Sequence, residues 1–276
     1  MIDYGFIGNE VIEGFGLLTK GLSNSSLNIN SIPGLSFYNK KAVSFTRTPE
    51  KISTLIDFNI INSFFKHSEL YNLAFKHNFK PRLIDHLERK LNRTFSIEIA
   101  RGCIKFKGNN ACSFCSIQYG RFWKNQVTSP VDAWTIIQNA FNKGYDFLQV
   151  TADELPLTFS SLLHGMRQST PYWFRRLAAD ERPVLSGYAR SDGIAIEKNA
   201  KLLHDLGFRI IMIGIDGGPI DSLAALNKQL MGDRNRKLQT LYEKNIECFK
   251  MAKRYGLKIH VGFIIGHFGM DKDLLH

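Results

Sequence analysis

The sequence predicts an α/β fold in which a parallel sheet is built from repeated strand–helix units. Beyond about residue 95, short runs of β-branched and aromatic residues alternate with amphipathic helical runs, which is the pattern of βα repeats. Most of the strand runs are continuously apolar, as expected for strands that are covered on both faces. Each helical run ends at a glycine and a strand follows at once, which is typical of the return from a helix into such a sheet.

Five strands are expected in this part of the chain. The first alternates apolar and polar residues with a period of two, and the others are mostly continuous apolar runs. The segments between them are long enough for the crossover that parallel strands require. The expected strands cover residues 95–99, 145–150, 183–188, 208–215 and 257–265.

Three helices between these strands have clear boundary signals. The first begins at Ser129-Pro130, an N-cap followed by a first-turn proline, and ends before Gly144. The other two end before Gly207 and Gly256. We expect these side chains to face the sheet: Ala133, Ile136, Ile137, Ala140 and Phe141, then Ile196, Ala200, Leu203 and Leu206, then Leu238, Tyr242, Ile246 and Phe249.

Residues 1–94 differ in character from the rest. They contain an apolar start, a stretch rich in serine and asparagine, and a turn at Ile32-Pro33-Gly34. A helix is expected over residues 62–76, and no internal repeat is visible. The change of pattern places a domain boundary near residue 92.

Composition and charge exclude several classes of protein. The chain has 276 residues, of which 44% are hydrophobic and 22% charged, so a disordered or fibrous protein is excluded. The net charge of +11 permits an anionic partner without specifying one. No apolar run approaches the roughly 18 residues of a membrane helix, and the N-terminus lacks the pattern of a secretory signal. We therefore expect a cytoplasmic protein with no membrane span.

Three of the four cysteines lie together directly after the first strand. Cys112 and Cys115 form a C-x-x-C pair that can direct two thiolates at one metal centre, and Cys103 can supply a third. Residues 100–131 contain five basic side chains and no acidic one, which favours thiolates. An iron–sulfur cluster with one iron open to a small molecule fits three ligands. A zinc site completed by Cys248 or a histidine, or unligated thiols, stay open as alternatives.

These motifs resemble those of the radical SAM superfamily. The cysteine triad follows Arg101-Gly102 and has an aromatic residue, Phe114, before its last cysteine. Residues 214–218 (GIDGG) resemble the GIESG-type motif of that family, 226–228 (LNK) resemble its L-x-K, and 262–266 (GFIIG) resemble its GxIxG. The eight residues between the first two cysteines depart from the commoner CxxxCxxC spacing. The resemblance implies a partial (β/α) barrel with about five of six strands present.

The resemblance also implies cofactors and site residues. It implies a 4Fe-4S cluster on Cys103, Cys112 and Cys115, with S-adenosylmethionine on the open iron. The resemblance also implies that Asp153 and Glu154 bind the methionine ammonium, and that Arg190 binds the carboxylate or the ribose. It implies a cofactor-binding role for Asp216 in the GIDGG motif, and it places Gly262 and Ile264 against adenine.

The N-terminal residues have a resemblance of their own. Residues 2–10 and 32–35 (IPGL) are similar to the junction between a cobalamin-binding domain and a radical SAM domain. This implies that residues 1–40 are a remnant of a preceding domain, 41–94 a linker with a helical segment, and 95–276 a radical SAM core truncated after its fifth strand. We therefore expect the chain to be a fragment. We also expect its N-terminal part to be an α/β remnant.

The function that the resemblance implies is reductive cleavage of S-adenosylmethionine to start radical chemistry. The reaction is hydrogen abstraction, or methyl transfer where cobalamin is supplied, with a flavodoxin or ferredoxin as electron donor. The sequence leaves a small molecule, a peptide or RNA open as the substrate. Two alternatives stay open: a zinc-dependent nucleic-acid-binding protein, which nine basic against three acidic residues over 228–258 would suit, and an inactive relative that only binds S-adenosylmethionine.

Overall fold

The computed structural model describes most of the chain beyond residue 92 and parts of the chain before it. The helix predicted over residues 62–76 and the Pro33-Gly34 turn lie outside the described residues. Among the described helices, none is both long and apolar enough to cross a bilayer. The described residues are 4–6, 11–26, 28–32, 35–39, 42–46, 93–106, 111–115, 125–217, 220–228 and 234–266.

The N-terminal part combines one helix with a small antiparallel sheet. Strand β2 lies between β1 and β3 in this sheet, and both pairings are antiparallel. Leu18 of the helix packs with Ile32 and Leu35 in a small apolar cluster of its own. An α/β segment is therefore present here, as predicted. Its elements are β1 (Tyr4–Phe6), α1 (Val11–Ser23), a 3-10 turn (Ile29–Ser31), β2 (Leu35–Asn39) and β3 (Ala42–Phe45).

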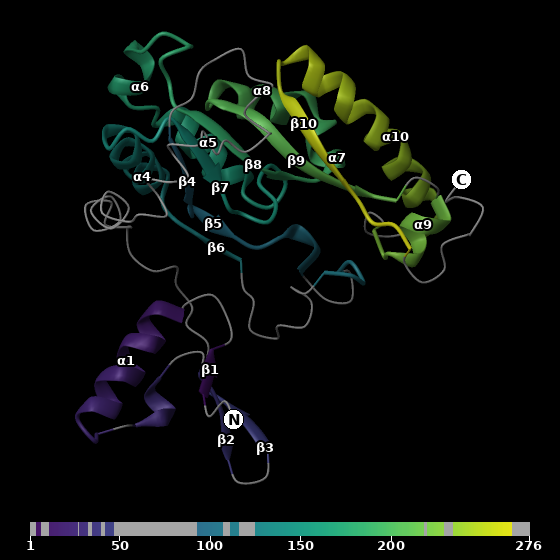
Figure 1. The fold of residues 1–276 in the computed structure, drawn as a ribbon. Helices are drawn as coiled ribbons and strands as arrows, with labels where there is room; N and C mark the ends of the chain where they lie inside the picture. Colours follow the sequence, from purple (N-terminus) through teal and green to yellow (C-terminus); the bar gives the residue numbers. More distant parts are fainter. Residues whose placement is uncertain are drawn as a thin grey trace, which may run out of the picture.

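The main sheet has five strands that pair in parallel, in the same order as in the sequence (Figure 1). A doubly wound sheet would reverse its strand order at one point, whereas a (β/α) barrel proceeds in one direction. The prediction of a partial (β/α) barrel with five strands is therefore confirmed. The strands are β4 (Thr94–Ile97), β7 (Phe147–Val150), β8 (Val184–Ala189), β9 (Phe208–Asp216) and β10 (Lys258–Phe263).

Helices fill the crossovers between these strands, and the predicted boundary signals are present. The Ser129 hydroxyl accepts a hydrogen bond from the Asp132 amide at 3.1 Å, so it caps α4. Gly144, Gly207 and Gly256 have positive φ, which lets the chain turn back into the sheet. The helices are α4 (Pro130–Asn142), α5 (Ser160–Gln168), α6 (Tyr172–Arg176), α7 (Ser191–Ile194), α8 (Glu197–Asp205), α9 (Ile220–Ala225) and α10 (Arg234–Arg254).

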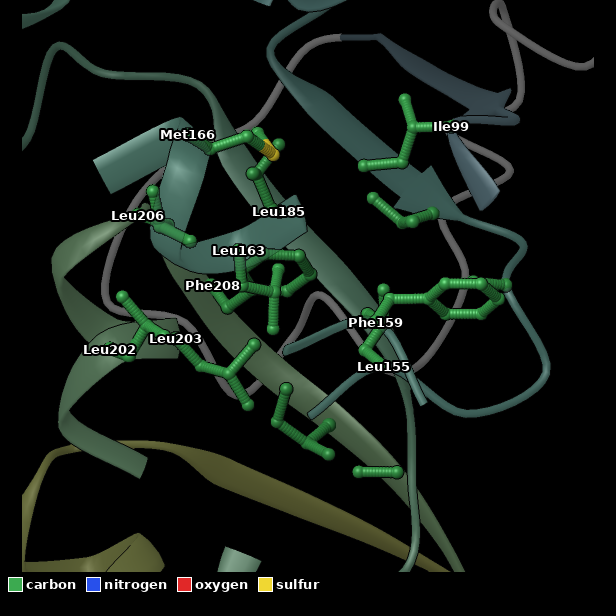
Figure 2. Close-up of a cluster of buried hydrophobic side chains, with 14 of the residues drawn as sticks. Ile99, Leu155, Phe159, Leu163, Met166, Leu185, Leu202, Leu203, Leu206 and Phe208 are labelled. Atoms are coloured by element: carbon green, nitrogen blue, oxygen red, sulfur yellow. The ribbon is translucent and has the colours of Figure 1, made fainter. Parts of the chain in front are cut away.

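One hydrophobic core joins the helices to a single face of the main sheet. Leu163 of α5 and Leu203 of α8 are buried against Leu185 and Phe208 of the central strands (Figure 2). The apolar side chains predicted for α4 and α8 belong to this core, except that Ile196 and Phe141 are only partly buried. Continuous burial of this kind fixes the strand ends, and with them the loops that carry the polar site.

The face predicted for α10 is wrong. Tyr242, Ile246 and Phe249 are exposed, and the helix instead buries the parallel row of Leu241, Asn245, Cys248 and Ala252. Asn245 is tolerated in the core because its side-chain oxygen accepts a hydrogen bond from the Ser191 hydroxyl. Because Asn245 is polar, the pattern of apolar residues alone did not identify the buried face of α10.

Candidate functional site

The segment that carries the three cysteines, residues 102–125, is here called the cysteine loop. A short antiparallel pair of strands joins its two ends. Strand β5 (Ala100–Arg101) pairs with β6 (Gln126–Val127), so both ends of the loop are held at the carboxyl edge of the main sheet. Gly102 follows with φ of 126°, and its amide donates a hydrogen bond of 2.7 Å to the Asp153 carboxylate. A side chain at this position would collide with Asn125. The glycine of the Arg-Gly pair is therefore required by the backbone.

The three predicted cysteines line one cavity of about 440 Å³. Cys112 is buried, and Cys103 and Cys115 are partly buried. Burial raises the pKa of the Cys103 thiol to about 11. Among the described residues, no three His, Cys, Asp or Glu side chains converge so as to hold a single metal ion. The thiols therefore share a cavity without meeting at one point.

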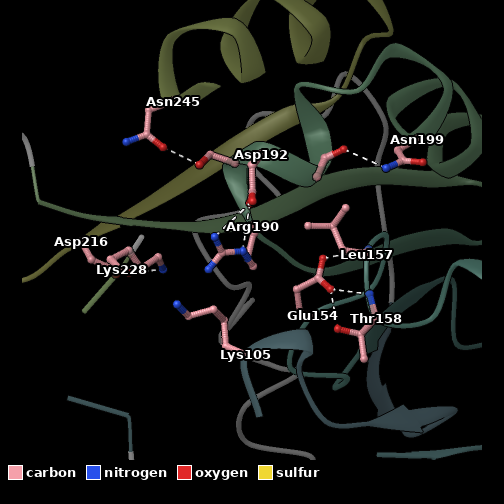
Figure 3. Close-up of polar contacts among 12 residues, drawn as sticks. Lys105, Glu154, Leu157, Thr158, Arg190, Asp192, Asn199, Asp216, Lys228 and Asn245 are labelled. Carbon is pink, nitrogen blue, oxygen red and sulfur yellow. Dashed lines mark hydrogen bonds and ion pairs between the residues drawn. The ribbon is translucent and has the colours of Figure 1, made fainter. Parts of the chain in front are cut away.

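Asp153 and Glu154 lie in the loop that follows β7, and both border the cavity, but their oxygens have different partners. The Asp153 carboxylate accepts the hydrogen bond from the Gly102 amide described above. Both oxygens of buried Glu154 accept bonds from its own loop, namely from the amides of Leu157 and Thr158 and from the Thr158 hydroxyl (Figure 3). Burial raises the pKa of each carboxyl. Glu154 therefore stabilises the loop that follows β7, whereas Asp153 links this loop to the cysteine loop.

Arg190 directly follows β8 and is almost completely buried at the cavity wall. Asp192 accepts two hydrogen bonds from its guanidinium, at 2.9 and 3.1 Å, in a bidentate pair. Burial opposes the charge, but Asp192 outweighs it and raises the pKa of Arg190. The structure therefore keeps a fixed cation beside the cysteine loop.

Asp216 ends β9 with a positive φ of 65°, and its carboxylate forms a buried ion pair with Lys228. Its side chain folds back over Gly214, where a Cβ would lie 2.7 Å from the carboxylate. The pair joins the two short motifs GIDGG and LNK, which are separated by α9 in the sequence. Both residues border the cavity.

Two of the predicted site residues lie apart from this group. Gly262 pairs with Gly214 on the neighbouring strand, and the Ile264 amide donates to the Asp216 carbonyl at 3.0 Å. Neither residue lines the described cavity. The structure therefore brings together the three cysteines, Asp153, Glu154, Arg190 and Asp216. It leaves Gly262 on β10, and Ile264 just after that strand, outside the cavity lining.

Several cavity residues are missing from the set predicted by sequence. Lys105 is buried and contacts a carbonyl more than a hundred residues away, so no local pattern marks it. Lys228 was visible only as part of the L-x-K resemblance. Tyr188 faces the cavity from β8, and its hydroxyl accepts a hydrogen bond from Gln149 at 3.2 Å. Cys248, named above as a possible zinc ligand, is buried in the core, donates to the Asn245 carbonyl and does not line the described cavity.

Among known proteins, similarity to this chain is found in solved structures but not in sequence. No protein-family model matches the sequence, and no curated protein matches it. The radical S-adenosylmethionine methyltransferase TsrM from Kitasatospora setae, solved with cobalamin and a 4Fe-4S cluster bound, is similar with a TM-score of 0.62 and 15% identity. The cobalamin-dependent S-adenosylmethionine radical enzyme OxsB, solved with aqua-cobalamin and S-adenosylmethionine bound, is similar with a TM-score of 0.57 and 16% identity.

These similarities cover most of this chain but only part of each neighbour. They extend over 95% of the chain for TsrM and 92% for OxsB. The chain spans 47% of the length of TsrM and 32% of that of OxsB. At these identities the likeness establishes the fold. The resemblance seen in the cysteine and glycine motifs is thereby confirmed at that level: the chain has the fold of cobalamin-dependent radical SAM enzymes.

Proposed function

We propose that this chain holds a 4Fe-4S cluster on Cys103, Cys112 and Cys115 and cleaves S-adenosylmethionine reductively to start radical chemistry. The observation that carries the proposal is the single cavity that the three thiols share with Asp153 and Arg190, at the carboxyl ends of parallel strands. Parallel α/β folds assemble their active sites at this edge.

The donor set fits a cluster better than a zinc ion. A structural zinc ion needs its ligand atoms about 2.0–2.3 Å from one point, whereas the cysteines of a cluster bind different irons and stay apart. The described residues gather no group of the first kind. The cations of Lys105, Arg190 and Lys228 border the same cavity and favour an anionic centre. When bound, the cluster supplies the electron that S-adenosylmethionine accepts.

The protein's own residues bind and orient S-adenosylmethionine in this proposal. Arg190, fixed by Asp192, offers a positive charge to the methionine carboxylate. Asp153, beyond the carboxyl end of the neighbouring strand β7, offers a negative charge to the ammonium group. The adenine contacts of Gly262 and Ile264 stay a prediction.

Methyl transfer is the reaction that we propose first, because both structural neighbours are cobalamin-dependent or cobalamin-bound and one is a methyltransferase. Hydrogen abstraction is the alternative within the same chemistry. A flavodoxin or ferredoxin would supply the electron. The substrate class and the cytoplasmic location stay predictions.

Anaerobic reconstitution with iron and sulfide tests the proposal. We expect about four irons per chain, an EPR signal in the reduced protein that changes when S-adenosylmethionine is added, and formation of 5′-deoxyadenosine. Cys112→Ala is expected to lose the intact cluster, and Cys248→Ala is the matched control that keeps it. Stoichiometric zinc in protein purified without oxygen would support the zinc alternative instead. A cluster that binds S-adenosylmethionine without yielding 5′-deoxyadenosine would identify an inactive relative.

A further inference from the structure

We propose that Asn227 is a positioning residue for the cysteine loop, and that the turn of residues 225–228, here called the clamp turn, holds the thiols in place before any cofactor arrives. The purpose assigned to the clamp turn rests on the proposed function. The contacts that support it are properties of the polypeptide alone.

The clamp turn grips the part of the loop that carries Cys112 and Cys115. The Ser113 amide donates to the Leu226 carbonyl at 3.0 Å, and the Ser113 hydroxyl donates to the Ala225 carbonyl at 3.2 Å. The Asn227 side-chain amide donates to the Ala111 carbonyl at 2.6 Å. Three hydrogen bonds therefore bracket Cys112 on both sides.

The same turn also reaches the part of the loop that carries Cys103. The Lys105 ammonium donates to the Asn227 main-chain carbonyl at 3.2 Å. Asn227 thus contacts one limb of the loop through its side chain and the other through its backbone. Fixing both limbs from one residue sets the separation between Cys103 and the C-x-x-C pair.

The backbone conformation explains why asparagine stands at this position. Asn227 has φ of 51°, in the left-handed region that glycine and asparagine adopt most readily. Glycine would fit the turn but has no side chain to donate to Ala111. Asparagine provides both the conformation and the donor.

The clamp turn is itself anchored in the scaffold on two sides. The Asn227 and Lys228 amides donate to the carbonyls of Ala224 and Leu223 and so cap α9, at 3.0 and 2.9 Å. Leu223 is buried against Leu241 of α10. Lys228 is paired with Asp216 at the end of β9. Supporting groups of this kind preorganise a site because they are themselves held rigidly.

The test compares Asn227→Asp and Asn227→Gly with the matched control Asn199→Asp. Both Asn227 variants keep a residue that tolerates positive φ but remove the donor. Asn199 is buried, and its side-chain amide likewise donates to a backbone carbonyl, that of Gly193 at 3.0 Å, within the helical layer. The control therefore loses a similar hydrogen bond without touching the cysteine loop.

Two readouts separate positioning from general stability. In the metal-free full chain, alkylation of Cys112 by iodoacetamide is followed by peptide mass spectrometry. In the reconstituted chain, iron loss to a chelator is timed and the EPR spectrum of the reduced protein is recorded. Loss of a supporting group typically weakens metal binding 10- to 100-fold, so we expect iron loss to become about 10-fold faster in the Asn227 variants. We also expect faster alkylation of Cys112 in these variants, and no change in either rate in Asn199→Asp.

Equal rates in the Asn227 variants and in the original chain would overturn the inference, as would an equal increase in Asn199→Asp. If the original chain takes up no cluster, the proposed function fails, and the alkylation of metal-free protein still decides whether the clamp turn positions Cys112.

Discussion

The helix-covered face of the main sheet and the cavity at its carboxyl edge use neighbouring residues of the same strands, but different forces hold them. On β9, Ile213 belongs to the apolar core, while Asp216, three residues later, holds Lys228 at the cavity. Burial in the core is non-directional and spread over many side chains. At the cavity, by contrast, individual polar groups such as Asp153, Arg190 and Asp216 each have a specific partner. Damage to the core should therefore cost stability alone, and damage to the cavity should also disturb the cysteine loop.

The largest effect is expected from Lys228→Met, which leaves the Asp216 carboxylate buried without its partner. The two side chains are 11% and 9% exposed, so the free energy of unfolding should fall by about 4 kcal/mol, measured by urea denaturation. Lys201→Met is the control, because Lys201 pairs with Asp205 on the surface at 57% exposure. That change should cost less than about 1 kcal/mol. Similar losses in the two variants would contradict the distinction between cavity and surface.

Leu163→Ala should remove about 3 kcal/mol from the free energy of unfolding, because a fully buried side chain leaves a void in the core. Under the proposed function, this variant should still retain iron like the original chain at temperatures where it is folded. Val131→Ala, at a side chain that is 64% exposed, should leave stability nearly unchanged. Loss of iron from folded Leu163→Ala protein would show that core and cavity are not separable.

Gly102→Ala should cost about 2 kcal/mol through backbone strain and should also loosen the cysteine loop, since the new Cβ would press on Asn125. Gly256→Ala is a matched control at φ of 63° with no atom within 4 Å of the added Cβ. The control should cost about 1 kcal/mol from conformation alone. The rate of Cys103 alkylation, measured in Gly102→Ala and in Gly256→Ala, reports whether the cysteine loop has moved. Identical rates in the two variants would argue against a constraint at Gly102.

The smallest effect concerns acid stability in the helical layer. Burial opposes ionisation of Asp205, but the hydrogen bond and charge of Lys201, with Arg167, outweigh it and lower the pKa of Asp205. Because the folded pKa lies below the unfolded one, this stabilisation is present above the ordinary pKa of aspartate and is lost as the pH falls from there through the lowered pKa of the folded state. Asp205→Asn should therefore show a shallower loss of stability in acid, by less than about 1 kcal/mol. Parallel curves for the variant and the original chain would contradict this contribution.

The sequence predicted the main sheet well because its central strands β7, β8 and β9 are buried along most of their length and therefore appear as apolar runs. All five predicted strands are present, and their ends differ by a few residues. Short helices such as α7 and α9 were missed, since four to six residues carry too little periodicity to recognise. The buried face of α10 was misassigned because Asn245 interrupts its apolar row.

The site was predictable where motifs mark it and hidden where tertiary contacts make it. The cysteines and the strand-end residues Asp153, Arg190 and Asp216 meet at one cavity, as their positions after consecutive strands indicated. Lys105 and Asn227 were missed because each acts on a partner more than a hundred residues away. Contacts of that kind leave no trace in local spacing.

The long separation between the cysteine loop and the clamp turn also determines the order in which the site can form during synthesis. Asn227 and Ala111 are 116 residues apart, so the cysteines leave the ribosome long before their support is made. Domains generally fold as units, and this contact cannot close until β9 and α9 have been translated. Under the proposed function, cofactor insertion is therefore expected to follow completion of the fourth strand and its helix, and a nascent chain stopped before residue 225 should leave its thiols unprotected.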